Sequence, residues 1–342
     1  MESAQTFWPR RKGWILSVAA GVVLGCLYRG MFDVRWGRHG DAALVMTLGF
    51  LLVVPFCMGY LVVSTYLRQR ADARWHQWFF LPWLSVLITM AVSVAVKWEG
   101  AVCLVFAAPL MLLGSALGGA VARVASKQWN EPVAGTASAF ALPLLIILME
   151  AHLAAAWQIR AVETDALIHA PASVVWENIR SVPAIAPAEL PGSWVTRIGF
   201  PKPVAATLSH EGIGGVRAAS FTGGVVFTET ITRWQPDEDL RFSIRANTES
   251  IPTTTLDEHV SIGGAFFDVL DGEYRLEPRP GGVLLRLVSH ERLSTHFNPY
   301  AGLWTDAVMR SIQGEILEVI RKRCEGAQPG ESRIRAGLPV LR

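Results

Sequence analysis

Long apolar segments without charged residues constrain this chain more than any other feature of its sequence. Residues 42–67, 78–96 and 101–122 contain no Asp, Glu, Lys or Arg, and about 20 apolar residues are enough for a helix to cross a bilayer. Further apolar runs lie before and after these three. The sequence therefore predicts an all-α membrane bundle of about five transmembrane helices. The predicted spans are 14–32, 42–66, 78–97, 101–122 and 136–157.

The composition divides the chain into two chemically different halves. Of the 342 residues, 18% are charged, whereas a soluble domain carries about 25%. Residues 1–160 contain 13 Lys or Arg against 7 Asp or Glu, and residues 161–342 contain 18 against 22. An apolar basic half is thus followed by a mildly acidic half of ordinary soluble composition. Neither half has the basic aromatic stripe or a reader motif of a nucleic-acid-binding protein, which argues against that class.

The Lys and Arg residues of the short loops indicate how the spans are oriented. With the N-terminus inside the cell, eight lie on the inner side and five on the outer side. Five spans then give a multi-pass protein of the cell (inner) membrane with an extracytoplasmic C-terminal half, and one false span would invert that placement. No small-residue cleavage site follows the first apolar run, so we interpret it as a signal-anchor helix rather than a signal peptide.

The predicted membrane half lacks the features of a transporter. Glu99, Glu150 and His152 are the ionisable residues at or near the spans that call for inspection. Two Gly-x-x-x-Gly motifs, at 21–25 and 114–118, allow helices to approach closely, either within the bundle or in a dimer. A transporter normally has more intramembrane charge and repeated helices. We therefore expect an anchor or a small-ligand chamber.

From residue 160 the sequence changes to the alternation of apolar and polar residues that is typical of strands. A strand around 162–166 precedes a short helix that begins near Pro171, because proline fits the first turn of a helix. A Pro-rich loop follows. Later strands are predicted at 215–221, 225–234, 239–246, 255–262, 272–279 and 282–293.

The last predicted element is an amphipathic helix from about residue 302 to 323. Its apolar face carries Ile312 and Ile316 at the centre, and Gln313 lies off that face. Residues 326–342 combine Gly, Pro and scattered charge, and we expect a disordered tail there.

The start of this half contains the pattern Ile168-x-Ala170-Pro171-Ala172-x-x-Val175-Trp176. It resembles the opening signature of the polyketide cyclase/dehydrase family, which belongs to the helix-grip (SRPBCC) superfamily of START and Bet v 1-like proteins. The order of elements over residues 160–325 is similar as well. The resemblance implies an α+β domain whose antiparallel sheet grips the long C-terminal helix around an apolar cavity. It implies no catalytic residue, since the superfamily has no universal one. The whole arrangement also resembles uncharacterised bacterial membrane proteins.

Few polar residues are available to line such a cavity. Glu229 lies inside an apolar strand, where it either faces the cavity or points outward and pairs with Arg233 or Arg245. His259 follows two acidic residues, but a metal site needs ligands that converge from other strands, so we predict neither a metal nor a cofactor. The candidate cavity residues are Glu229, Arg245, His259, His290, Arg292, His296, Trp304 and Val308.

Three functions remain open at this point. The first is a membrane-tethered domain that binds, or also transfers, a lipid or another hydrophobic small molecule. The second is an enzyme of cyclase or dehydratase type that uses Glu229 or His290 as an acid or base, although no motif presents a nucleophile. The third is a membrane sensor or assembly protein without an open cavity. An apolar pocket with few polar groups suits an amphipathic ligand, so we expect the first, with membrane lipids and a hydrophobic molecule as partners. The sequence leaves the oligomeric state open.

Overall fold

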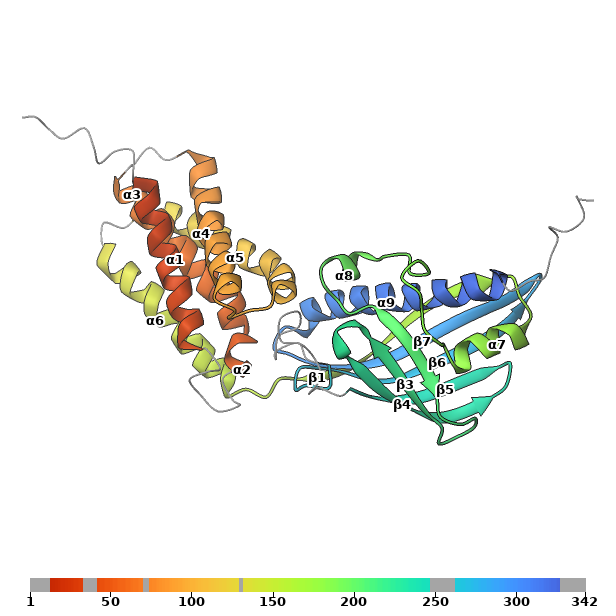
Figure 1. Cartoon of the computed structure of the whole chain (residues 1–342). Helices are drawn as coiled ribbons and strands as arrows, with labels where there is room; N and C mark the ends of the chain where they lie inside the picture. Colours follow the sequence, from red (N-terminus) through yellow and green to blue (C-terminus); the bar gives the residue numbers. More distant parts are fainter. Residues whose placement is uncertain (1–12, 33–41, 70–73, 129–131, 247–261, 327–342) are drawn as a thin grey trace, which may run out of the picture. The chain divides into compact units, whose positions relative to one another are not determined.

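Helices make up the first half of the chain and a sheet with one long helix makes up the second (Figure 1). The structure is a computed structural model that describes residues 13–32, 42–69, 74–128, 132–246 and 262–326. His259, most of the strand predicted at 255–262 and the predicted tail lie outside these residues. The chain divides into two units. Among the described residues, the helical unit contains the chain through Gln158 together with residues 262–266 and Leu293–Ala301, and the sheet unit contains the rest.

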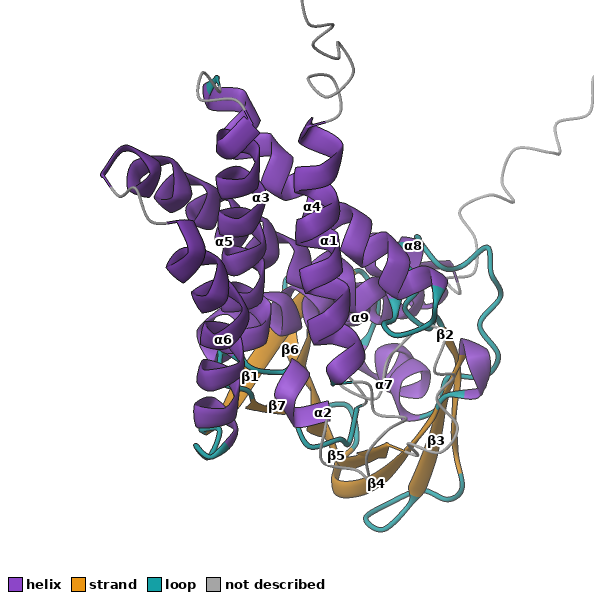
Figure 2. Cartoon of the chain, turned by 90° about the vertical axis from the view of Figure 1, so that its left-hand side faces the viewer, coloured by secondary structure: helices purple, strands orange, loops and turns teal. Residues whose placement is uncertain are grey.

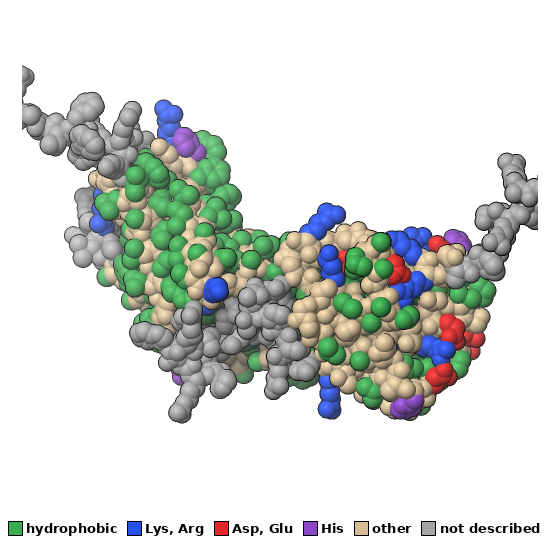
Figure 3. Space-filling view, viewed as in Figure 1, with side chains coloured by type: hydrophobic (Ala, Val, Ile, Leu, Met, Phe, Trp, Pro, Cys, Tyr) green, Lys and Arg blue, Asp and Glu red, His purple; other side chains and the backbone are tan. Residues whose placement is uncertain are grey.

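The helical unit contains four helices that are long and apolar enough to cross a membrane, within the described residues. Figure 2 shows them side by side, and Figure 3 shows hydrophobic side chains over their visible surface. Four of the five predicted spans are therefore confirmed as helices of sufficient length and apolar character, whereas the fifth corresponds to a helix that is apolar over the shorter stretch Ala137–Ala151. The elements are α1 (Gly13–Met31), α2 (Ala42–Val45), the π-helix η2 (Gly49–Val53), α3 (Val54–Gln69), α4 (Trp75–Ala95), α5 (Ala101–Gln128) and α6 (Pro132–Ala151).

Glycines bring the helices of this unit into backbone contact. A Cβ atom added at Gly59 would lie 1.9 Å from the Ser115 carbonyl oxygen, and one added at Gly118 would lie 1.8 Å from that of Phe56. Helices α3 and α5 therefore cross where only glycine fits. The motif at 21–25 packs in the same way against side chains of α3 and α4. Both Gly-x-x-x-Gly motifs are thus used for packing inside the unit.

The sheet unit is built on a seven-stranded sheet in the order β1-β7-β6-β5-β4-β3-β2. The neighbouring pairs from β2 to β6 are antiparallel, and α9 lies along one face of the sheet (Figure 1). This is the element order and layout of the predicted helix-grip domain. The strands are β1 (Trp157–Ile168), β2 (Pro203–Leu208), β3 (Val216–Phe221), β4 (Val226–Gln235), β5 (Asp239–Ala246), β6 (Phe267–Arg279) and β7 (Gly282–Ser294), and the helices are α7 (Ala172–Arg180), α8 (Trp194–Arg197), α9 (Asn298–Gly326) and the 3-10 turn η3 (Thr222–Gly224).

The core of the sheet unit differs from the prediction along α9. Leu317 and Ile320 are buried in the hydrophobic core, but Ile312 is only half-buried. Gln313, which we placed off the apolar face, is 1% exposed. Its amide donates hydrogen bonds to the Val162 carbonyl at 3.1 Å and to the Ser289 hydroxyl at 3.0 Å. A polar side chain therefore holds the middle of the helix to the sheet, because its hydrogen bonds compensate for burial.

Two elements of this unit are absent from the prediction. Strand β2 and the single-turn helix α8 both lie in the segment that we interpreted as a Pro-rich loop. Proline is tolerated at the first residue of a strand and on edge strands. β2 begins at Pro203 and is one of the two edge strands of the sheet, which explains why its segment has the composition of a loop.

Candidate functional site

The register of the strands determines which side chains of the sheet face the helices. Residues directly opposite each other in an antiparallel pair lie on the same face. Ile231 pairs with Phe242, and both belong to the hydrophobic core together with Leu317 of α9. On the same face, Glu229 lies opposite Arg217 on one side and opposite Ile244 on the other. The glutamate and the arginine therefore point into the interior of the sheet unit.

Arg217 and Glu229 form a buried ion pair on this inner face. They are 2% and 7% exposed. The Nε atom of Arg217 donates to a Glu229 carboxylate oxygen, and its Nη1 atom donates to the carbonyl oxygen of Ile179, in α7, at 2.6 Å. The guanidinium lies over the ring of Phe242, 4.3 Å from the centroid, and 5.6 Å from that of Tyr274. Strands β3, β4, β5 and β6 and helix α7 thus all contribute to one site.

Burial controls the electrostatics of this site. It raises the pKa of Glu229, and the Arg217 guanidinium acts in the opposite direction. Burial also raises the pKa of Tyr274. A guanidinium does not lose its proton in proteins, so a buried Arg217 requires a counter-ion. Glu229 is the carboxylate that supplies it.

The ion pair separates two parts of the inner face. On one side of it, Ile231 and Phe242 are 1% and 3% exposed and form the packed core. On the other side, Phe227 is only half-buried, and Ile244, which lies level with the pair and packs against the edge of the core, is half-buried as well. The apolar residues of α9 show a similar difference, because Leu317 and Ile320 are buried whereas several apolar residues nearer its start are only half-buried. The half-buried residues of α9 with apolar side chains include Trp304, Val308 and Ile312.

A second buried carboxylate, Glu291, lies on the side of β7 that faces α9. It is 0% exposed, and its Oε1 atom lies 4.0 Å from Nε of Arg160. The guanidinium of Arg160 is itself bound to the Asp306 carboxylate by hydrogen bonds of 2.9 and 2.8 Å. Burial raises the pKa of Glu291, and the Thr305 hydroxyl opposes the shift. This cluster joins β1, β7 and the early part of α9.

Several predicted cavity residues lie on the outer face of the sheet. Arg245 is opposite Thr228 and is exposed. His290 and Arg292 alternate with Ser289 and Glu291, which face α9. His290 instead places its Nδ1 atom 2.6 Å from the Asp271 carboxylate. Among the predicted polar residues, Glu229 is therefore the one that the structure places at the ion pair.

The outer face carries a carboxylate pair of its own. Asp239 and Glu273 are 8% and 2% exposed and lie on neighbouring strands. Burial raises the pKa of Asp239, and a hydrogen bond with Glu273 adds to this effect. Against the effect of burial, the Arg275 guanidinium lowers the pKa of Glu273. These groups face away from the core, so they do not converge with Glu229.

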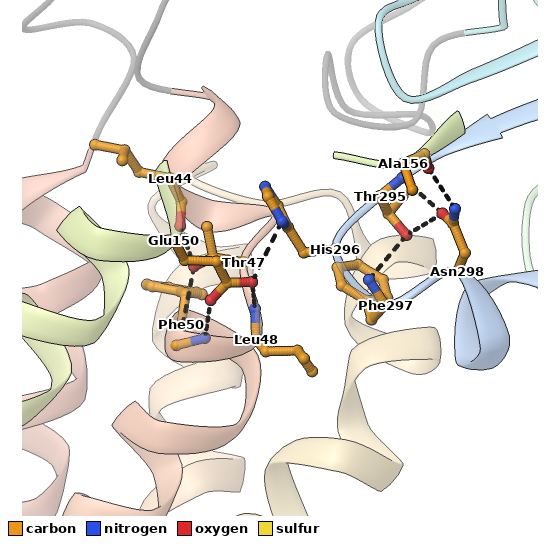
Figure 4. A network of polar contacts seen from close by, with 11 residues as sticks. Leu44, Thr47, Leu48, Phe50, Glu150, Ala156, Thr295, His296, Phe297 and Asn298 are labelled. Atoms are coloured by element: carbon orange, nitrogen blue, oxygen red, sulfur yellow. Dashed lines mark hydrogen bonds and ion pairs between the residues drawn. The ribbon is translucent and has the colours of Figure 1, made fainter. Parts of the chain in front are cut away.

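His296 belongs to a polar network of the helical unit (Figure 4). Its Nδ1 atom lies 3.8 Å from a carboxylate oxygen of Glu150. That carboxylate accepts hydrogen bonds from the backbone N–H groups of Leu48 at 2.7 Å and Gly49 at 2.9 Å. The first N–H groups of a helix have no partner within the helix, so Glu150 caps the start of η2. His296 is thus part of a structural contact rather than of the predicted cavity mouth.

An open surface pocket of about 450 Å³ lies beside α7. Its single cation, Arg180, is already bound to Glu177 and Glu211. Polar and apolar residues line this pocket in similar numbers, in contrast to the mainly apolar cavity that we predicted. They are Ser173, Val174, Trp176, Glu177, Arg180, Glu211, Trp234, Pro236 and Asp237.

The arginine of the ion pair is absent from the residues predicted for the site. Its sequence signal is the alternation in β3, where Arg217 and Ala219 share the buried positions and Ala218 is exposed. An arginine at a buried position of a strand indicates a buried counter-ion. In the part of the chain that the structure describes, no group of three or more His, Cys, Asp or Glu residues could hold a metal ion.

No protein-family model and no curated protein matches the chain. Among solved structures, DynU16 from the dynemicin biosynthetic locus is 15% identical, with 47% of this chain and 46% of that chain covered and a TM-score of 0.28. A protein from Chromobacterium violaceum is 15% identical, with 48% of this chain and 98% of that chain covered and a TM-score of 0.29. The Aha1 dimer from Colwellia psychrerythraea is 12% identical, with 48% of this chain and 96% of that chain covered and a TM-score of 0.28. The chain thus spans less than half of DynU16. The architecture described above rests on this chain's own strands and helices, and such distant similarities carry no functional conclusion.

Proposed function

We propose that the protein is anchored in a membrane and binds a lipid or another hydrophobic small molecule in its sheet unit. The observation that carries the proposal is the half-buried apolar part of the inner face, which begins at the Arg217–Glu229 pair and continues beyond it. A ligand site of this kind combines mainly apolar walls with a few polar groups that fix orientation. Phe227, Ile244 and Val308 supply apolar surface, and the ion pair supplies the polar group.

The helical unit supports the membrane part of the proposal. Four helices are long and apolar enough to span, and a membrane concentrates hydrophobic molecules near any domain attached to it. Helix α6 is the fifth span in our proposal, because its 20 residues correspond to about 30 Å, the thickness of the hydrocarbon core. With the charge bias of the loops, five spans place the sheet unit outside the cytoplasm.

Lipids that copurify with the full chain test the binding proposal. Mass spectrometry of the detergent-extracted protein should find one class of hydrophobic molecule enriched over the surrounding membrane. Val308→Trp should reduce that enrichment by filling the site. Leu303→Trp is the matched control, because Leu303 lies on the same helix and is 68% exposed. No enrichment in the folded protein would favour an assembly role and contradict ligand binding.

Reporter fusions test the topology. An enzyme that is active only in the cytoplasm should be silent when fused after Cys324 and active when fused after Lys127, which lies on the predicted inner side. Activity after Cys324 would show that α6 does not span or that the orientation is the opposite one.

A further inference from the structure

The charge balance of the Arg217–Glu229 pair restricts the chemistry of the ligand's polar end. The guanidinium carries one positive charge and the carboxylate one negative charge, so the pair is neutral as a unit. The hydroxyl of Tyr274 interacts with Arg217 and is also affected by Glu229, and an uncharged phenol leaves the balance at zero.

The location of the pair makes this balance relevant to a ligand. Glu229 lies directly opposite the half-buried Ile244 and two residues from the half-buried Phe227 on the same face. Beyond the pair, Ile231 and Phe242 are packed in the core. An elongated apolar molecule lying on Phe227 and Ile244 would therefore end at the ion pair.

A charged headgroup would be poorly accommodated at that point. A carboxylate, sulfonate or phosphate would compete with Glu229 for Arg217 and leave one negative charge buried without a partner. An ammonium group would likewise leave one positive charge unpaired. A hydroxyl both donates and accepts a hydrogen bond, so it can donate to the carboxylate and accept from the guanidinium without disturbing their charge balance.

We propose that the sheet unit selects long apolar molecules that end in an uncharged hydroxyl group and rejects anionic and cationic amphiphiles. This inference rests on the proposed ligand-binding function and specifies its ligand class. Glu229 acts here as the selectivity determinant, because it neutralises the arginine that would otherwise attract an anion.

Matched photoaffinity probes test the selectivity on the full chain in lipid nanodiscs. The probes are hexadecanol, hexadecanesulfonate and hexadecyltrimethylammonium, each with the same diazirine in its chain. The sulfonate is chosen because its charge does not depend on pH. Peptide mapping separates labelling of β4, β5 and α9 from labelling of the membrane helices. The alcohol should label the peptides of the sheet unit about tenfold more than either ion, since an unpaired buried charge is costly.

Glu229→Gln provides the decisive variant. It removes the negative charge and leaves Arg217 available to an anion, so the ratio of sulfonate labelling to alcohol labelling should rise about tenfold. The control is Glu163→Gln, which removes a charge from a side chain that is 47% exposed and pairs with Arg286, and it should leave all labelling unchanged. Arg217→Met/Glu229→Gln removes both charges and should reject the sulfonate again, which covers the case in which Glu229→Gln alone fails to fold.

The outcomes separate this inference from the proposed function. Equal labelling of the sheet unit by the alcohol and the sulfonate would overturn the selectivity and leave ligand binding intact. An unchanged ratio of sulfonate labelling to alcohol labelling in a folded Glu229→Gln protein would overturn the role of Glu229. Absence of labelling in the sheet unit by all three probes would contradict ligand binding itself.

Discussion

The helical unit and the sheet unit both bury charged side chains, but they place them at different points of their secondary structure. In the helical unit, Arg29 at the end of α1 pairs with Glu99 in the turn after α4 at 2.6 Å, and Glu150 caps the start of η2. In the sheet unit, Arg217 and Glu229 pair in the middle of adjacent strands. One unit uses charge at the ends of its elements and the other uses it inside.

This difference separates structural charges from functional ones. The ends of a helix leave backbone groups without partners, so a carboxylate at such an end has a structural task. Strands inside a sheet have their backbone groups paired already, and a buried ion pair seldom stabilises more than apolar side chains of the same volume. Apart from the hydrogen bond from Arg217 to the Ile179 carbonyl in the last turn of α7, the Arg217–Glu229 pair has no evident structural task, which is consistent with a role in ligand binding.

The largest expected effect concerns the glycine crossing of the helical unit. Gly118→Val would place a side chain against the Phe56 carbonyl, where even a Cβ atom would lie at 1.8 Å. The detergent-extracted variant should lose its single peak in size-exclusion chromatography, because α3 and α5 must separate. Gly314→Ala in α9 is the control, since no atom lies within 4 Å of the added Cβ. This variant should remain monodisperse, and its free energy of unfolding should rise by about 0.5–1 kcal/mol. A monodisperse Gly118→Val protein would contradict the crossing.

Breaking the ion pair on one side only should give the next largest effect. Arg217→Met leaves Glu229 buried without its partner, which should cost about 3–5 kcal/mol. Arg217→Met/Glu229→Leu should recover most of this loss, because neither side chain is then charged. Hydrogen exchange of peptides from β3, β4 and β6 in the full chain measures both changes. If the double variant is no more stable than Arg217→Met alone, the ion pair stabilises the fold, which would contradict the difference between the two units.

Removing the helix-capping charge should have a smaller effect. Glu150→Gln retains one acceptor for the N–H groups of Leu48 and Gly49 but loses the charge at a helix N-terminus, which should cost about 1 kcal/mol. The midpoint of thermal unfolding in detergent should fall slightly. His152→Gln changes a side chain that contacts the Leu148 carbonyl near the same end of α6 rather than this cap, and it should lower the midpoint less than Glu150→Gln does. A loss as large as that of Arg217→Met would remove the contrast between the two units.

The smallest expected effect is a pH dependence at the surface of the sheet unit. Hydrogen bonds from Arg323, with a further one from the Ala186 N–H group, lower the pKa of Glu189 to about 2. Because the pKa of Glu189 in the folded protein lies below its unfolded value near 4.3, the ionised carboxylate contributes its full stabilisation of the fold above about pH 4.5. It is lost as the pH falls toward 2, and it should amount to at most about 1 kcal/mol. Exchange protection of the last turn of α9 should fall with pH in this range, and Glu189→Gln should abolish the dependence.

Local sequence patterns predicted most elements of both units. Uncharged apolar runs located the membrane helices, and alternation located six of the seven strands that the structure shows. These signals are visible in the sequence because burial imposes a period on neighbouring residues. Strand β2, at one edge of the sheet, was not predicted because its segment is rich in proline. The burial of Gln313 was not predicted because its hydrogen-bond partners, Val162 and Ser289, are far away in the sequence.

The candidate site was predictable only in part, for the same reason. Glu229 stands out as a carboxylate in an apolar strand, but the sequence alone left open whether it faces inward. Arg217 decides that question, and it reaches Glu229 only through the register between β3 and β4. The outward position of His290 and Arg292 likewise depends on which face of β7 the long helix covers. Register and face are properties of the assembled sheet rather than of any single strand.

The glycine crossing also has a consequence for the order in which the chain is made. Roughly 60 residues separate Gly59 and Gly118, the two glycines of the crossing, so at about 5–20 residues per second the ribosome needs roughly 3–12 s to add the second after the first. During that interval α3 has no α5 to fill its glycine groove. A helix in a bilayer satisfies its own backbone hydrogen bonds, so α3 can remain folded in the membrane while lipid occupies the groove at its glycine. Synthesis therefore precedes packing at this crossing, and the membrane itself acts as the temporary partner.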